Sequence, residues 1–253
     1  MLGIYFTGTG NSQYVLEVFL KKYDKTAHIC TLTDKDITHY IRNSEEIIFS
    51  YPVQFSNIPK ILKDFVDKNY GLWQKKHIFV IATMGLFSGD GAGILARRLQ
   101  KYGAQIEGGL HLKMPDSIAD ERALKRSLER NKALVRAAEQ KIDKAVKKLK
   151  CGDPPQEGIG FLSYMAGLLG QRLYFYHKTQ CYSDRLKIDT QKCVGCGKCA
   201  TQCPTQNIHI EQNTAKASNQ CTMCYRCVNL CPQQAITLLG KKVVAQGTIE
   251  KYL

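Results

Sequence analysis

Eight of the 11 cysteines lie between Cys193 and Cys231 and repeat a single spacing. The two runs are Cys193-x2-Cys196-x2-Cys199-x3-Cys203-Pro204 and Cys221-x2-Cys224-x2-Cys227-x3-Cys231-Pro232, and every matched position is offset by 28 residues. A disulfide scaffold is disfavoured in a chain of 253 residues whose cysteines gather in one segment. Thiolates at such short spacings are metal ligands, so this segment predicts a metal-binding domain.

The complete run, present twice, resembles bacterial ferredoxins with two 4Fe–4S clusters. Zinc is the less favoured alternative, because a zinc site needs four ligands but accepts many spacings. In the family, the fourth cysteine of each run serves the other cluster. The resemblance therefore implies one cluster on Cys193, Cys196, Cys199 and Cys231. It implies a second cluster on Cys221, Cys224, Cys227 and Cys203.

Lys198 and Arg226 take equivalent places in the two runs, each immediately before a third cysteine. A positive charge there favours the more negative reduced form of a cluster and raises its potential. The alternative is that both side chains face solvent and are partly screened.

A second chemical feature lies near the N-terminus. Thr7, Gly8, Thr9, Gly10, Asn11 and Ser12 form a Gly- and hydroxyl-rich turn between an apolar run and a helical pattern. Backbone N–H groups of such a turn, opening onto a helix N-terminus, cradle a phosphate. The turn lacks the Lys of a Walker loop and the spacing of G-x-G-x-x-G, so neither ATP nor a dinucleotide is favoured. The alternative is an ordinary strand–helix turn with glycines present for steric reasons.

The elements that must position this turn alternate along the chain. Apolar segments fit strands at 2–6, 27–32, 47–51, 78–83 and 106–112, and helical stretches near 59–68 and 91–102 lie between strands. Alternation of this kind predicts an α/β fold with a doubly wound parallel sheet. Because ligands bind at the carboxyl ends of such strands, the loops after strands one, three and four are the informative ones.

These loops resemble those of the flavodoxins over residues 1–150. The turn at 7–12 is similar to the family's loop for the FMN phosphate, with Ser12 where Thr is common. The loop after the third strand contains Tyr51, Pro52, Val53, Gln54 and Phe55. The loop after the fourth strand contains Thr83, Met84, Gly85, Leu86, Phe87, Gly89, Asp90 and Gly91. The resemblance implies that both loops contact the flavin ring, with Phe55 and Phe87 as stacking candidates.

We therefore expect residues 1–150 to form a flavodoxin-like FMN-binding domain and residues 181–253 a small α+β ferredoxin domain. Residues 119–150 predict one long helix carrying 11 basic and 5 acidic side chains. Either these charged side chains form an ordinary solvent-exposed face of the helix, or this face docks an acidic partner. Residues 151–180 predict a linker, with apolar segment 159–177 packed between the domains or, alternatively, lying at a membrane surface.

The whole chain resembles the flavodoxin–ferredoxin fusion proteins of anaerobic bacteria and archaea, often called EFR-type ferredoxins. The resemblance implies electron transfer between FMN, two low-potential 4Fe–4S clusters and external redox partners. The first alternative is an FMN-dependent reductase of a small organic substrate, fed by the clusters. A lesser alternative is a redox sensor with a basic nucleic-acid-binding surface. We identify no catalytic acid, base or nucleophile.

Composition narrows the cellular setting. The formal net charge is +14, with 36 basic and 22 acidic side chains, which favours acidic redox partners over nucleic acid. No apolar run reaches 18 residues, so we expect no membrane span. Because the N-terminus shows no secretory signal and the cysteines are interpreted as reduced ligands, we expect a cytoplasmic protein.

Overall fold

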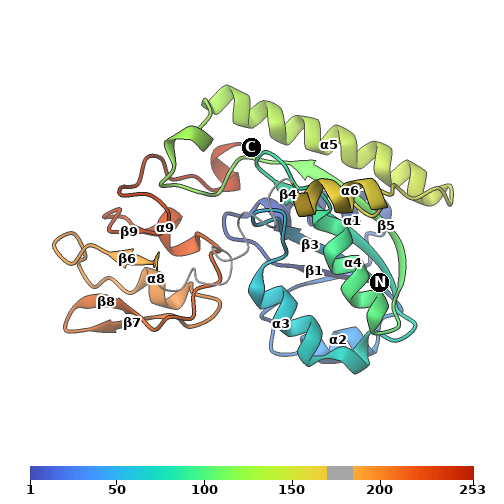
Figure 1. Ribbon diagram of the computed structural model, residues 1–253, viewed down its shortest axis with the longest axis horizontal. Coiled ribbons are helices and arrows are strands. Elements are labelled where there is room, and N and C mark those ends of the chain that lie inside the picture. The colour runs from blue at the N-terminus through green and yellow to red at the C-terminus, as the bar shows by residue number, and fades with distance from the viewer. Residues whose placement is uncertain (170–184) are drawn as a thin grey trace.

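The first half of the chain forms a five-stranded parallel sheet covered by helices on both faces (Figure 1). The computed structural model describes residues 1–169 and 185–253. The strands of the sheet are β1 (Leu2–Tyr5), β2 (His28–Thr31), β3 (Glu46–Pro52), β4 (His77–Met84) and β5 (Gln105–Lys113). Their order is β2-β1-β3-β4-β5, and every neighbouring pair is parallel. This order is that of the flavodoxin-like doubly wound fold, which confirms the predicted fold class.

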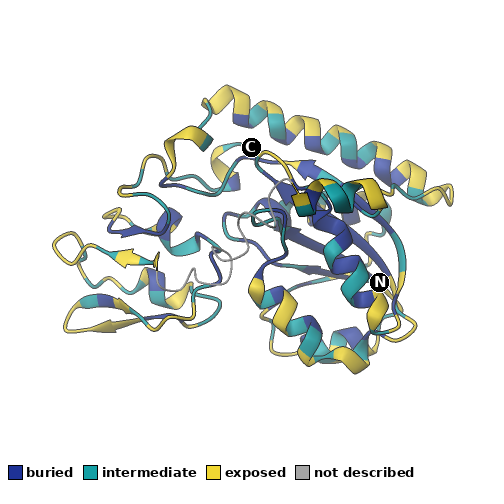
Figure 2. Ribbon diagram, in the orientation of Figure 1, coloured by how far each residue is buried: buried dark blue, intermediate teal, exposed yellow. Residues whose placement is uncertain are grey.

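Alternate side chains along each strand pack into two separate hydrophobic cores, one on each face of the sheet. On β3, Ile47 and Phe49 pack with one face, whereas Ile48 packs with the other. The first core is covered by α2 (Ile37–Arg42), α3 (Lys60–Lys68) and α4 (Gly91–Lys101), and the second by α1 (Asn11–Tyr23) and α5 (Leu128–Lys150). Burial on both faces explains why these strands are continuous apolar runs (Figure 2). The short helix α2 was not predicted from the sequence.

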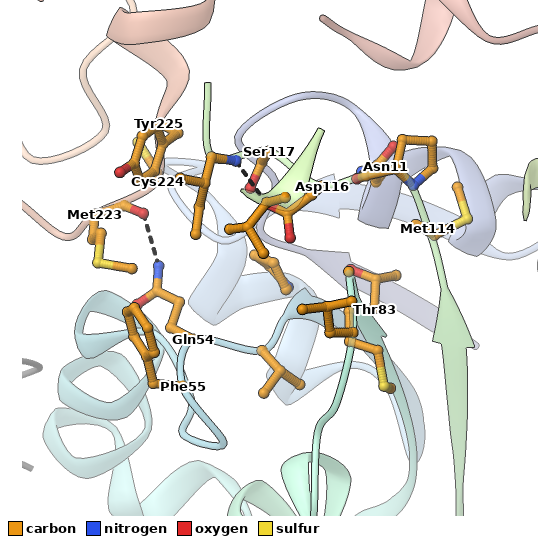
Figure 3. Close-up of a pocket in the computed structure, with 18 of the residues that line it drawn as sticks. Asn11, Gln54, Phe55, Thr83, Met114, Asp116, Ser117, Met223, Cys224 and Tyr225 are labelled. Carbon is orange, nitrogen blue, oxygen red and sulfur yellow. Dashed lines mark hydrogen bonds between the residues drawn. The ribbon is translucent and has the colours of Figure 1, made fainter. Parts of the chain in front are cut away.

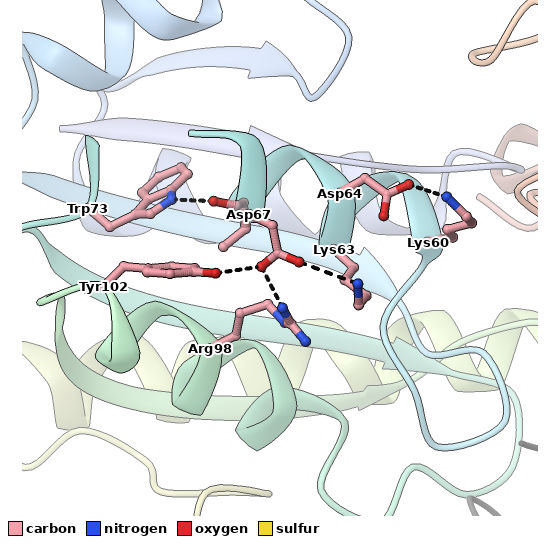
Figure 4. A network of polar contacts seen from close by, with 8 residues as sticks. Lys60, Lys63, Asp64, Asp67, Trp73, Arg98 and Tyr102 are labelled. Atoms are coloured by element: carbon pink, nitrogen blue, oxygen red, sulfur yellow. Dashed lines mark hydrogen bonds and ion pairs between the residues drawn. The ribbon is translucent and has the colours of Figure 1, made fainter. Parts of the chain in front are cut away.

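A polar network joins α3 to α4 on the first face (Figure 4). Asp67 accepts from the Tyr102 hydroxyl at 3.0 Å and forms ion pairs with Arg98 and Lys63. Trp73, which follows the short helix η1 (Tyr70–Leu72), is fully buried and donates from Nε1 to the Val66 carbonyl at 2.9 Å. None of these side chains lies at the carboxyl ends of the strands, so this network stabilises the scaffold.

The prediction of one helix over 119–150 is wrong at its start. Helix α5 begins at Leu128, where the Ser127 hydroxyl caps it by accepting from the Arg130 N–H at 3.2 Å. Residues 119–127 instead form a loop with one short turn, η2 (Arg122–Leu124). Ala119 in this loop is fully buried in the core of the cysteine-rich domain, which pulls the segment out of a helical path. Helix α5 itself carries eight basic and three acidic residues.

The cysteine-rich half is a small α+β domain. It contains the strand pairs β6–β9 (Lys187–Ile188 with Ile236–Thr237) and β7–β8 (Ile208–Glu211 with Thr214–Ala217), both antiparallel. Two short helices, α8 (Lys198–Thr201) and α9 (Arg226–Leu230), start at equivalent points of the repeat. Its core gathers Cys199 and Ile208 from the first repeat and Val228 and Ile236 from the second. The two repeats therefore fold as one body.

The two halves are interlocked by segments that cross in both directions. Asp120, from the loop after β5, accepts from the Tyr225 hydroxyl at 2.9 Å and from the backbone N–H of Leu238 at 2.6 Å. In the other direction, the C-terminal turn η5 (Ile249–Lys251) returns to the first domain, and Ile249 joins the core under α1 and α5. The division at residues 150 and 181 stays a prediction.

The segment after α5 lies against the first domain. Residues 155–157 add to the free edge of β5, with the Gly109 N–H donating to the Pro155 carbonyl at 2.8 Å. Helix α6 (Phe161–Gly167) packs on α4, where the Arg97 guanidinium lies over the Tyr164 ring. The remainder of the predicted packing helix, 170–177, lies outside the described residues. Within residues 1–169 and 185–253, no helix is long and apolar enough to cross a membrane.

Candidate functional site

A cavity opens where the carboxyl ends of β3, β4 and β5 meet the cysteine-rich domain (Figure 3). It holds about 830 Å³ of empty space, part of it open to solvent. From the predicted loops it is lined by Asn11, Pro52, Val53, Gln54, Phe55, Thr83, Met84, Gly85, Leu86 and Phe87. Three loops far apart in the sequence thus meet at one cavity, at the strand ends where ligands of doubly wound sheets bind.

The other predicted loop residues lie behind this cavity. Tyr51 is fully buried, and its hydroxyl donates to the Gly91 carbonyl at 2.6 Å. Asp90 is buried and paired with Arg97, while Gly89 packs against Gly167 of α6. These residues shape the loop after β4 from behind and do not border the cavity.

The turn at 7–12 borders the cavity only through Asn11. Other side chains of the turn form hydrogen bonds within the protein. Thr7 Oγ1 accepts from the Gly10 N–H at 3.0 Å, and the Ser12 and Thr83 hydroxyls are hydrogen-bonded at 2.8 Å. Gly10 has φ +90°, a left-handed conformation that favours glycine. The turn leads into α1, whose first-turn N–H groups have no partner within the helix. This backbone can therefore still offer N–H donors to an anion.

Asn11 provides the test of whether a hydroxyl-bearing ligand fits. Its Nδ2 donates to the Pro115 carbonyl at 2.7 Å, whereas its buried Oδ1 has no hydrogen-bond partner among the described residues. A buried acceptor without a hydrogen bond lowers the stability of the fold, so we expect Oδ1 to accept a hydrogen bond from a bound molecule. A ribityl chain carries hydroxyl donors. The cavity wall and this unpaired oxygen both fit FMN.

The cavity is also lined by two segments that the sequence did not reveal as part of the site. The loop after β5 contributes Met114, Pro115, Asp116, Ser117 and Ile118, and the second repeat contributes Met223, Cys224 and Tyr225. Asp116 Oδ1 accepts from the Ile118 N–H at 2.8 Å, and Oδ2 faces Gly85 so closely that a Cβ on Gly85 would lie 2.0 Å away. Burial raises the pKa of the Asp116 carboxyl. Position after a strand is the one sequence signal that could have flagged the 114–118 loop.

The second repeat reaches the strand ends through direct contacts. Gln54 Nε2 donates to the Thr222 and Met223 carbonyls, each at 3.1 Å (Figure 3 draws the bond to Met223). The Cys224 carbonyl lies against Gly8, where an added Cβ would be only 1.8 Å from the oxygen. Gly8 therefore has a steric role as well as its place in the predicted phosphate loop.

The eight cysteines fall into two groups around two smaller cavities. Cys193, Cys196, Cys199 and Cys231 line one of them, which we call the outer cysteine cavity. Cys203, Cys221, Cys224 and Cys227 line the other, the inner cysteine cavity. Each cavity thus takes three cysteines from one run and the fourth from the other run, in the sets that the ferredoxin resemblance implies.

The surroundings of these sulfurs suit thiolate ligands. Backbone N–H groups donate to sulfurs of both cysteine cavities. The Asn207 N–H donates to Cys203 Sγ of the inner cavity at 3.2 Å, and the Ala235 N–H donates to Cys231 Sγ of the outer cavity at 3.3 Å. Burial raises the pKa of Cys221 to about 11, so this side chain is a protonated thiol near neutral pH unless a cation binds it as a thiolate. Within the described ranges, no three His, Cys, Asp or Glu residues are placed to bind one metal ion. Four cysteines line each of the two cysteine cavities, an arrangement that fits a polynuclear cluster.

Comparisons with known proteins gave one family match and several structural neighbours. Residues 185–232 match the family model described as a 4Fe-4S dicluster domain. A comparison with curated proteins gave no match. Among solved structures, an archaeal flavodoxin is 12% identical, with a TM-score of 0.42, over 59% of this chain and 97% of that one. Megasphaera elsdenii flavodoxin is 18% identical, with a TM-score of 0.41, over 55% and 99%.

A third solved structure, Fusobacterium nucleatum flavodoxin bound to flavin mononucleotide, is 16% identical, with a TM-score of 0.42, over 59% of this chain and 96% of that one. Similarities of this degree carry no argument about function. The flavodoxin-like fold is defined here by the chain's own strand order and connections. The chain joins this flavodoxin-like domain to a 4Fe–4S dicluster domain, as a flavodoxin–ferredoxin fusion does.

Proposed function

We propose that this protein transfers electrons between FMN, two 4Fe–4S clusters and external redox partners. One observation carries the proposal: Cys224 lines both the strand-end cavity and the inner cysteine cavity. The two sites share a wall, so groups held in them lie in adjacent spaces of one interlocked body. A flavin exchanges one or two electrons and a cluster exchanges one, which makes their fusion suited to electron transfer.

The residues for each group follow from the cavities. Cys193, Cys196, Cys199 and Cys231 would hold one cluster, and Cys203, Cys221, Cys224 and Cys227 the other. Asn11, the 52–55 and 83–87 segments, and the unpredicted Asp116 would surround the flavin. The turn at 7–12 would take the FMN phosphate through backbone N–H groups.

Cofactor analysis of the full chain tests this proposal. Protein purified without oxygen should contain FMN and about eight iron per chain. Zinc in place of iron, or protein without flavin after supply of FMN, would refute it. A Cys30→Ser variant is the matched control, because Cys30 is buried in β2, outside both cysteine sets, and should leave iron unchanged.

A specific observation also supports the reductase alternative. Met84, Leu86 and Phe87 separate the strand-end cavity from a second cavity lined by Ser88, His111, Leu134 and Lys141, among others. Leu86 and Phe87 are about half exposed, so the flavin edge would not be fully closed there. A small organic substrate would enter from this second cavity. If so, Leu134→Trp should block reoxidation of the reduced protein by small organic acceptors while leaving reoxidation by redox proteins unchanged.

For protein partners, we propose acidic redox proteins that dock at the outer cysteine cavity. Of the eight repeat cysteines, Cys196 alone is exposed, and Val194 beside it is 51% exposed. Lys192 and Lys198 flank this surface and are exposed as well. The inner cysteine cavity, by contrast, faces the first domain through Cys224. Electrons would therefore enter or leave the protein at the outer cavity.

A further inference from the structure

Arg226 belongs to the cysteine repeat, but its side chain reaches the first domain. Its Nη2 donates to the Thr7 carbonyl at 2.7 Å, and its Nη1 donates to the Gln202 carbonyl at 3.0 Å. It thereby ties the predicted phosphate loop to both runs of the cysteine repeat. The equivalent residue of the first repeat, Lys198, is exposed on α8.

The bond from Arg226 fixes the direction of one peptide in the loop. A trans peptide is planar, so the Gly8 N–H points opposite to the Thr7 carbonyl. Because Arg226 holds that carbonyl on the side of the second domain, the Gly8 N–H points away from the Arg226 guanidinium. The Ile249 N–H holds the next carbonyl but one, that of Thr9, at 2.8 Å. Two donors from the C-terminal half thus set the loop's backbone.

Charge gives Arg226 a second effect. The turn from Thr7 to Ser12 contains no basic residue, and the first turn of α1 contains none. A phosphate carries up to two negative charges, and a neutral cradle offers it only dipoles. The guanidinium of Arg226, bonded directly to the turn, adds a full positive charge beside it.

We propose that Arg226 is a positioning residue for the phosphate of FMN, supplied by the cysteine-rich domain to the loop of the flavodoxin-like domain. The proposal rests on the proposed FMN site. It makes that site composite: Gln54 bonds the second repeat, Cys224 covers Gly8, and Arg226 orients and charges the turn. FMN affinity then depends on the second domain through a defined side chain.

The duplicated repeat supplies its own control for the test. Arg226→Gln and Lys198→Gln each remove one positive charge at matched positions, but only the first contacts the loop. Affinities for FMN and for riboflavin, which lacks the phosphate, are measured by flavin fluorescence on the full chain after flavin removal. Arg226→Gln should weaken FMN binding about tenfold to a hundredfold, since the positive charge beside the phosphate is lost together with the bond that orients the turn. Riboflavin binding, and both affinities of Lys198→Gln, should be unchanged.

Each other outcome decides against the proposal. Unchanged FMN affinity in Arg226→Gln would overturn it, and so would an equal loss for FMN and riboflavin, which indicates a general structural defect. Arg226→Lys keeps the charge and should bind FMN with intermediate affinity at normal iron content; affinity equal to that of the Gln variant would overturn the role of charge. Failure of the wild-type chain to bind FMN would instead refute the proposed FMN site.

Discussion

At residue scale, the contact between Gly8 and the Cys224 carbonyl limits position 8 to glycine. A Cβ there would lie 1.8 Å from the carbonyl oxygen, closer than any real contact, so the second repeat must move away. We expect Gly8→Ala to destabilise the protein by about 1–3 kcal/mol, as other overpacked positions do. Faster anaerobic release of iron to a chelator and a lower urea midpoint would measure this effect.

Gly71 is the control for this substitution, because nothing lies within 4 Å of a Cβ added there. Gly71→Ala should release iron at the wild-type rate. If Gly8→Ala matched it in both measurements, the close packing of Cys224 on the phosphate loop would be contradicted.

His111 makes a second prediction at residue scale, through pH. Its Nε2 accepts from the Ala92 N–H at 3.2 Å, which requires a neutral ring, and its burial lowers its pKa to about 4. Glu157 and Asp90 raise this pKa and Lys141 lowers it, but burial dominates. The unfolded chain takes up a proton near pH 6.5, so stability is full above pH 6.5 and is lost as the pH falls toward 4.

Between pH 7.5 and 5.5, His111 should therefore remove about 1 kcal/mol from the free energy of unfolding. Urea unfolding followed by the fluorescence of Trp73, the single tryptophan, measures the first domain. His111→Gln is the control, because protonation of all other groups affects it and the wild type alike. Its free energy of unfolding should fall by about 1 kcal/mol less than that of the wild type between pH 7.5 and 5.5. An identical pH dependence in the two proteins would contradict the buried neutral ring.

Residue patterns that act locally were readable from the sequence. The cysteine runs resemble those of ferredoxins, which implied two sets of four, and the cysteines of each set line one of two cavities. Asp116 and Tyr225 were not readable as members of the strand-end cavity, because they come from a loop and a repeat that meet it only after folding. Arg226 was interpreted as a neighbour of a cluster, and nothing in the repeat shows that its side chain turns to Thr7.

At element scale, the loop between β5 and α5 is one of the segments that join the two domains. Its Asp120 is buried and accepts from the Tyr225 hydroxyl and from the N–H groups of Leu238 and Leu239. Because the oxygens of one carboxylate satisfy all three donors, an amide, with only one oxygen, cannot replace it. Asp120→Asn should cost about 1–3 kcal/mol, the range for leaving a buried hydrogen-bond donor without an acceptor.

Limited proteolysis of the loop, together with urea unfolding, would measure this loss. The control is the neighbouring exposed residue in Glu121→Gln, which changes charge equally at a side chain that accepts only from the Ala123 N–H. If the two variants were cleaved at the same rate, Asp120 would not be the residue that joins the domains.

The same loop is a segment whose secondary structure could not be predicted from local sequence patterns. The five strands and the helices near 59–68 and 91–102 follow from local apolar patterns, and they are observed within about two residues of the predicted bounds. Residues 119–127 continue the apolar pattern of the helix that follows. They leave it because Ala119 and Asp120 are buried in the other domain, a tertiary effect that overrides the local pattern.

At the scale of the whole molecule, the positive charge is divided between two distant places. Helix α5 carries eight basic residues, and its C-terminal half lies at the end of the molecule opposite the cysteine-rich domain (Figure 1). The outer cysteine cavity has fewer lysines, but they lie directly beside exposed Cys196. Clustered charge steers a partner to the place where it lies, so under the proposed function only the second location would serve electron exchange.

Charge reversal at matched positions distinguishes the two locations. Lys198→Glu and Lys147→Glu each lower the net charge by the same amount at an exposed lysine, the first on α8 and the second on α5. With an acidic rubredoxin as probe, stopped-flow oxidation of the reduced protein at low salt should slow about fivefold or more for Lys198→Glu and by less than about twofold for Lys147→Glu. The difference should vanish near about 0.5 M salt, where the charges are screened. Equal slowing by both variants would mean that net charge alone attracts the partner, and it would contradict docking at the outer cysteine cavity.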